Sequence, residues 1–105
     1  MKQYDIFGVD LNPTLGSEIN KIRPAVIISP DEMNDYLNTV IIAPITSTIK
    51  TYPFRIIFTL QQKKASIALD QVRTIDKVRL QNLIATLPNH TIREIKNILK
   101  EMLVE

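Results

Sequence analysis

The sequence contains no cysteine, only one histidine and only two glycines. Without cysteine the chain can form neither disulfides nor thiolate metal sites, and it has no thiol nucleophile. His90 alone supplies neither a histidine-pair nuclease nor a multi-histidine metal site. Gly8 and Gly16 stand apart, so a glycine-rich phosphate-binding loop is excluded. We therefore expect a protein that works without a metal ion or a bound cofactor.

Long apolar runs and a strong net charge are also missing. No apolar run is long enough to cross a bilayer and no signal peptide is recognisable, so we expect a cytoplasmic protein without a membrane partner. The formal net charge of +2 permits a nucleic acid as partner without requiring one. The acidic residues are scattered over different predicted elements and do not have the spacing of metal ligands.

The residues that are present are typical of one folded domain, residues 1–105. The chain is 45% hydrophobic and 23% charged, which separates it from disordered proteins. Helices are predicted at 31–37 with Asp31 as cap, briefly at 77–82, and at 91–105, where Thr91 and Glu94 fit a capping box with Asn89 as a rival cap. Apolar or alternating runs predict strands at 4–11, 25–29, 40–44, 54–60 and 65–72. This pattern predicts a mainly β fold, a small curled sheet or barrel with a C-terminal helix.

The stretch 40–55 is the expected working surface. Its strand is expected to break at Pro44. The hydroxyl residues 46–48 are then expected in a loop that leads to Lys50. Loops held by a rigid scaffold often carry function, and hydroxyls beside a lysine suit phosphate oxygens. Taken alone, however, the segment is explained better as an ordinary hairpin connection.

Polar residues at the ends of the predicted strands form a wider candidate set. Taken singly, each favours a structural role: Asp70 and Gln71 as a strand-end hydrogen-bonding pair, and Arg23 as a surface ion-pair partner. Only their joint occurrence favours a site. The set comprises Glu18, Arg23, Thr46, Ser47, Lys50, Asp70, Gln71 and Arg73.

Four separated blocks carry a resemblance to a known family. In order and spacing they resemble the MazF/PemK family of ribonuclease toxins, and the similarity runs through nearly the whole chain. The resemblance implies a small SH3-like barrel of the plasmid-maintenance-toxin type with a C-terminal helix, a homodimer, metal-independent cleavage of single-stranded RNA, and a cognate antitoxin. The blocks are residues 10–18, 23–29, 39–47 with 52–54, and 69–76.

The resemblance assigns the catalytic roles to Arg23 and Thr46. In the implied reaction a ribose 2′-hydroxyl attacks the adjacent phosphate and gives a cyclic phosphate and a free 5′-hydroxyl. A guanidinium suits the charge of the pentacoordinate phosphate, whereas its high pKa makes proton transfer difficult. Thr46 can donate to a phosphoryl oxygen. Glu18 or Asp70 is left as the general base, or as a residue that orients Arg23 and the nucleotide.

The remaining candidates are assigned to RNA contact. Ser47 and Lys50 are expected at phosphates, Phe54 in base stacking and Gln71 at base edges, with Glu18 and Asp70 in the same surface. Phe54 alternates with the next apolar residues of its strand, which favours a core position for it.

Departures from the family pattern leave details open. Asn20 and Lys21 stand where many members carry glycine, so the cut-site preference is not transferred. Ala68 stands where some members carry arginine, so no base comes from that position. Two alternatives to a nuclease are a non-enzymatic gyrase poison of the same fold, acting through its C-terminal helix, and a degenerate homologue that only binds its antitoxin.

Overall fold

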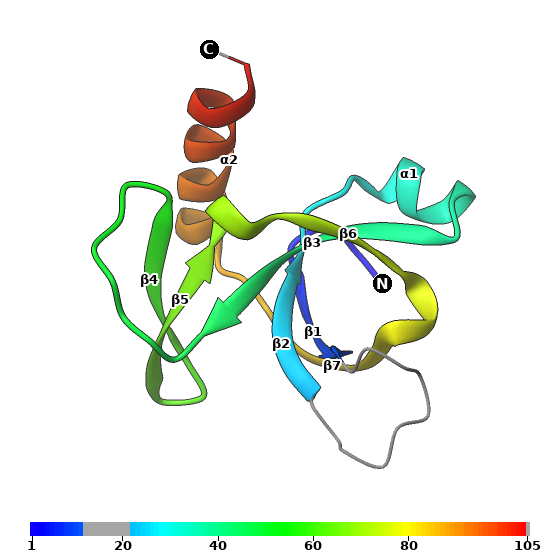
Figure 1. The fold of residues 1–105 in the computed structure, drawn as a ribbon, viewed down its shortest axis with the longest axis horizontal. Helices are drawn as coiled ribbons and strands as arrows, with labels where there is room; N and C mark the ends of the chain where they lie inside the picture. Colours follow the sequence, from blue (N-terminus) through cyan, green and yellow to red (C-terminus); the bar gives the residue numbers. More distant parts are fainter. Residues whose placement is uncertain (12–21, 105) are drawn as a thin grey trace.

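Antiparallel strands are the main regular element of residues 1–11 and 22–104, the part of the chain that the computed structural model describes (Figure 1). Two short 3-10 helices, η1 and η2, interrupt the strands in the second half of the chain. Neither α-helix is long and apolar enough to cross a membrane. In chain order the elements are β1 (Asp5–Asp10), β2 (Ile22–Ile27), α1 (Asp31–Tyr36), β3 (Thr39–Thr46), β4 (Arg55–Leu60), β5 (Lys63–Ala68), η1 (Leu69–Gln71), β6 (Arg73–Asp76), η2 (Lys77–Arg79), β7 (Leu80–Thr86) and α2 (Asn89–Leu103).

The sheet curls because β3 exchanges one neighbour for another along its length. The strand order is β4-β5-β3-β2-β1-β7, and β6 pairs with β3 outside this path. Residues 39–42 of β3 pair with β6, whereas Ile45 and Thr46 pair with β5. The resulting half-barrel with a C-terminal helix confirms the predicted fold class.

Pro44 does not break this strand, and that prediction was wrong. It lies within β3 and is the last residue that pairs with β2, opposite Ala25. It also falls between the last pair with β6 and the first pair with β5. A missing N–H is tolerated where a ladder changes partner, so β3 continues as far as Thr46.

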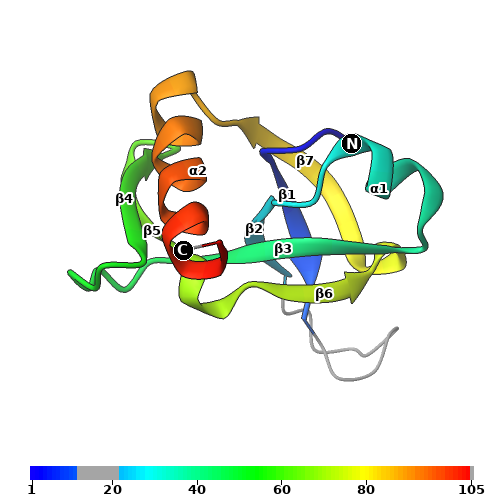
Figure 2. The same ribbon diagram turned by 90° about the horizontal axis from the view of Figure 1, so that it is seen from above.

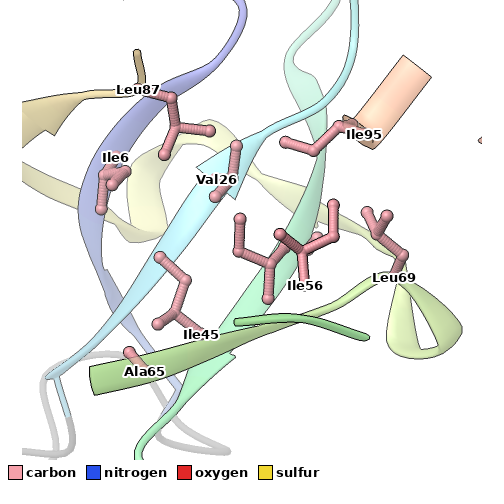
Figure 3. Close-up of a cluster of buried hydrophobic side chains, with 10 residues drawn as sticks. Ile6, Val26, Ile45, Ile56, Ala65, Leu69, Leu87 and Ile95 are labelled. Atoms are coloured by element: carbon pink, nitrogen blue, oxygen red, sulfur yellow. The ribbon is translucent and has the colours of Figure 1, made fainter. Parts of the chain in front are cut away.

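Buried aliphatic side chains form two clusters on opposite faces of the curled sheet. In the larger one, Ile95 of α2 packs with Ile56, Ile67 and Leu69, so the helix covers the β4–β5 side (Figures 2 and 3). The smaller one joins Val9, Ile27, Val40, Ile42, Ile75 and Ala25. Fully burying such a side chain stabilises the fold by roughly 1.5–3 kcal/mol. These clusters hold the ends of β2, β3 and β5 in fixed relation.

Several predicted boundaries were wrong. The strand expected at 65–72 is shorter, because η1 begins at Leu69. The segment expected to be helical at 77–82 is helical only in η2, from Lys77 to Arg79, and β7 begins at Leu80. Neither α-helix has a side-chain cap: prolines stand at both N-cap positions. Asp31 instead accepts a hydrogen bond from the backbone N–H of Gln3 at 2.7 Å. A proline with extended backbone starts each helix without help from Thr91 or Asp31.

Candidate active site

Arg23 lies near the beginning of β2, and the pairing of that strand fixes its position. Arg23 pairs with Val9 of β1, and the following Pro24 pairs with Gly8. A Cβ at Gly8 would lie 3.0 Å from Ile22 Cγ2, so a larger residue at position 8 would require the Ile22 side chain to shift. The backbone at Arg23 is therefore held firmly while its side chain is exposed.

Thr46 ends β3, directly opposite Ser66 of β5. Its side chain is half-buried, and its Oγ1 accepts a hydrogen bond from the backbone N–H of Thr48 at 3.1 Å. This short turn uses an acceptor site of the hydroxyl and leaves the hydroxyl hydrogen free to donate. Thr46 can thus offer a donor to an anionic oxygen.

One groove of about 600 Å³ brings these two residues together. Ser47, also predicted from the sequence, lines it beside Thr46. We call it the Arg23 groove. Its described lining residues are Leu11, Arg23, Pro24, Pro44, Ile45, Thr46, Ser47, Thr48, Leu60, Gln61, Lys63, Lys64 and Ala65.

Lys63 and Lys64 also line the groove, and sequence reasoning missed them. They begin β5, immediately after the two-residue turn at Gln61 and Gln62. In the sequence they form only the end of a polar turn. The only available indication was their adjacency, a basic pair at the tip of a predicted hairpin.

The other candidates lie outside the described lining of that groove, around the loop between β3 and β4 and the neighbouring η1. The backbone N–H of Leu69 donates to the carbonyl of Phe54 at 3.1 Å, which ties this loop to η1. Tyr52 lies between two cations in the sequence: Lys50 Nζ is 5.7 Å and Arg55 Cζ is 5.4 Å from the centroid of its ring. We call this region the Tyr52 patch: Lys50, Tyr52, Phe54, Arg55, Asp70 and Gln71.

Asp70 and Arg55 form a two-pronged ion pair in this patch. Arg55 Nε lies 2.7 Å from Asp70 Oδ1, and Arg55 Nη2 lies 3.2 Å from Asp70 Oδ2. The Arg55 side chain is 8% exposed and the Asp70 side chain is 34% exposed. The hydrogen bonds from Arg55 lower the pKa of Asp70 below its ordinary value. A carboxylate held in this way is a weaker proton acceptor, and its partner is Arg55 and not Arg23.

Phe54 is not part of either apolar cluster. Its side chain is 36% exposed, so the preference for a core position was wrong. Tyr52 beside it is 49% exposed. Two aromatic rings are therefore accessible in this patch, and Gln71 is exposed at its edge.

Two expectations about the site, the role of Glu18 and action without a metal ion, stay predictions. Glu18, together with Asn20 and Lys21, lies outside the described residues. Within residues 1–11 and 22–104, no three histidine or acidic side chains are close enough together to hold a metal ion. Metal-independent action stays a prediction.

The chain is similar to known proteins over almost its whole length. A family model described as "PemK-like, MazF-like toxin of type II toxin-antitoxin system" matches residues 2–103. A relative named Endoribonuclease MazF, from Staphylococcus saprophyticus, is 36% identical over 103 residues, which cover 92% of this chain and 86% of that protein.

Solved structures share the fold at lower identity. A mycobacterial endoribonuclease in complex with its cognate antitoxin superposes with a TM-score of 0.83 at 18% identity, covering 98% of this chain and 94% of that one. MazF from Deinococcus radiodurans gives a TM-score of 0.80 at 23% identity, covering 100% and 97%. From the family match and the 36% identical relative, this chain belongs to the family of PemK-like, MazF-like toxins of type II toxin–antitoxin systems.

Proposed function

We propose that this chain is a metal-independent, sequence-selective endoribonuclease that cleaves single-stranded messenger RNA in the cytoplasm and so inhibits translation. The 36% identical relative is named an endoribonuclease, which supports the activity. The observation that carries the proposal is the common groove of Arg23 and Thr46. A guanidinium and a hydroxyl facing one cavity can bind the same phosphodiester.

In the proposed reaction the ribose 2′-hydroxyl gives its proton to a general base while its oxygen attacks phosphorus, the bond to the 5′-oxygen breaks, and the departing 5′-oxygen takes up a proton. The products are a 2′,3′-cyclic phosphate and a free 5′-hydroxyl. Arg23 stabilises the extra negative charge on the pentacoordinate phosphate, and the Thr46 hydroxyl donates to a second phosphoryl oxygen. Arg23 binds charge and does not transfer the proton, because its pKa is too high.

Two carboxylates are candidates for the general base, Asp70 and Glu18. Asp70 is engaged by Arg55, and that ion pair lowers its pKa, which argues against proton abstraction by this carboxylate. Glu18 is the other predicted candidate, on sequence grounds alone.

The proposal includes a homodimer and a cognate antitoxin. Exposed apolar side chains gather on α1 and η2, where Tyr36 is 89% and Val78 62% exposed, and such side chains favour contact with another chain. A related endoribonuclease has been solved in complex with its cognate antitoxin, which supports a protein partner of this kind. Sedimentation at micromolar concentration should give a dimer, and a monomer would contradict this part.

The activity is tested by incubating the purified protein with a mixed-sequence RNA in excess chelator. We expect discrete fragments with 5′-hydroxyl ends, accepted by a kinase without prior phosphatase treatment. Fragments that form only after a divalent ion is added would contradict metal independence. Intact RNA under both conditions would favour the gyrase-poison or antitoxin-binding alternatives.

A further inference from the structure

The tip of the β4–β5 hairpin carries two adjacent lysines, Lys63 and Lys64. Gln61 and Gln62 form its two-residue turn with φ values of 51° and 69°, and Leu60 pairs directly with Lys63. Turns of this kind usually contain glycine or asparagine, because positive φ costs other residues about 1 kcal/mol or more. The tight turn therefore fixes the backbone position of Lys63 and Lys64 at the start of β5.

The sheet places this pair beside Thr46. Ser66 is the partner of Thr46 across the β3–β5 ladder, and Lys64 precedes Ser66 by two residues. Two residues of a strand span roughly 7 Å. The hairpin turn and the beginning of β2 lie at the same end of the molecule in Figure 1, so the lysines and Arg23 flank one groove.

The positive charge of this groove is not compensated by its described neighbours. Arg23, Lys63 and Lys64 line it, and none of the described lining residues is acidic. Within the part of the chain that the structure describes, these three basic side chains make no ion pair, whereas Arg55 is paired with Asp70. Three like charges facing one cavity repel each other, and an anionic ligand removes that repulsion.

We propose that Lys63 and Lys64 form a phosphate-binding arm that holds the RNA backbone next to the scissile phosphate. The inference rests on the proposed function, because the anion is taken to be the RNA on which Arg23 and Thr46 act. Lysine is a mobile point charge and suits the sequence-independent binding of a backbone phosphate. The arm binds and positions the strand, and it takes no part in the chemical step.

The test is the salt dependence of RNA binding. A fluorescently labelled, fully 2′-O-methylated RNA of mixed sequence cannot be cleaved, and its affinity is measured by anisotropy from 50 to 300 mM salt. Each phosphate contact with a single strand contributes about 0.7 to the slope of log affinity against log salt concentration. We expect Lys63→Ala and Lys64→Ala to reduce the slope by about 0.7 each, and the double variant by about 1.4.

Matched variants separate charge from structure. Lys96→Ala removes an exposed lysine of α2 and should leave the slope unchanged. Lys63→Arg with Lys64→Arg should restore the wild-type slope, because both charges are retained. With cleavable RNA, the double alanine variant should raise KM at least tenfold and change kcat less than twofold. An unchanged slope in the double alanine variant, or a loss confined to kcat, would overturn the inference.

Failure of the arm and failure of the proposed function give different results. If the wild-type protein cleaves RNA but its salt slope does not depend on the two lysines, the arm is refuted and the nuclease stands. If binding depends on the lysines but no cleavage occurs, the nuclease is refuted and the arm stands as an RNA-binding element. If the wild-type protein neither binds nor cleaves RNA, both are refuted.

Discussion

The Arg23 groove and the Tyr52 patch both carry basic side chains, but they differ in whether an acidic side chain lies beside them. In the groove, three cations share one cavity without an acidic neighbour among the described lining residues. In the patch, Arg55 donates two hydrogen bonds to Asp70, and its side chain is nearly buried. An unpaired cation is available to an anionic ligand, whereas a paired one mainly fixes local structure. Under the proposed function, the cations of the groove are therefore the ones open to RNA phosphates, and Arg55 shapes the surface beside them.

The largest expected effect is that of Arg23→Ala. Loss of a donor that stabilises transition-state charge typically lowers kcat by about 10²- to 10³-fold. The free energy of unfolding should change by less than about 0.5 kcal/mol, because the side chain is exposed. Single-turnover cleavage and chemical denaturation measure the two quantities.

Arg93→Ala is the matched control for this variant, since it removes an exposed arginine of α2. It should cleave RNA like the wild type. Full activity in Arg23→Ala would remove that residue from the reaction and would erase the distinction between groove and patch.

A smaller effect is expected for Phe54→Ala in the Tyr52 patch. Stacking of a base on an aromatic side chain is worth about 1–3 kcal/mol, so RNA affinity should fall by roughly 5- to 150-fold while the rate at saturation stays close to wild type. Ile57→Ala, which removes an exposed apolar side chain of the neighbouring β4, is the control. Equal affinities of the two variants would show that Phe54 does not stack on RNA.

The ion pair between Arg55 and Asp70 should make the thermal stability of the protein depend on pH in the acid range. Because the folded pKa of Asp70 lies below its ordinary value of 3.8, the pair stabilises the fold above that pH and loses its effect as the pH falls through the folded pKa. Asp70→Asn should therefore melt below the wild type at neutral pH and approach it in acid. Asp35→Asn on α1 controls for the change in net charge. A difference that stays constant down to pH 2 would contradict the pairing.

The smallest effect is expected at the turn that carries the groove's lysines. Gln62 has a φ of 69°, and glycine adopts this conformation without steric cost. Gln62→Gly should raise the free energy of unfolding by up to about 1 kcal/mol, since glycine's greater freedom in the unfolded chain offsets part of the gain. Gln62→Ala, which meets the same steric cost, should not stabilise. Greater stability of the alanine variant would contradict the strained turn.

The sequence singled out Arg23 and Thr46 through the resemblance to the toxin family, although the strand was expected to break at Pro44, before Thr46. The structure places both residues in one groove, and their catalytic roles stay predictions. The mainly β fold and the amphipathic last helix were equally accessible, because hydrophobic periodicity indicates them.

What the sequence did not predict depends on pairing between distant segments. The two lysines reach the groove only because the curl of the sheet brings the β4–β5 turn beside β2, about forty residues earlier in the chain. Asp70 meets Arg55 because the register places Arg55 opposite Ala68. β7 was missed because its sequence, Leu-Gln-Asn-Leu-Ile-Ala-Thr, lacks a clean alternation and its side chains are half-buried or exposed.

The central claim is that Arg23 and Thr46 act on the same phosphate. A double-mutant cycle with Arg23→Ala and Thr46→Val, measured by single-turnover cleavage in chelator, tests it most directly; Thr46→Ser, which keeps the hydroxyl, serves as the control. Residues that act as a unit are strongly non-additive, so we predict a coupling energy of at least about 1 kcal/mol, with the double variant little slower than Arg23→Ala alone. Losses that add to within about 0.5 kcal/mol would show that the two side chains act independently and would contradict the account.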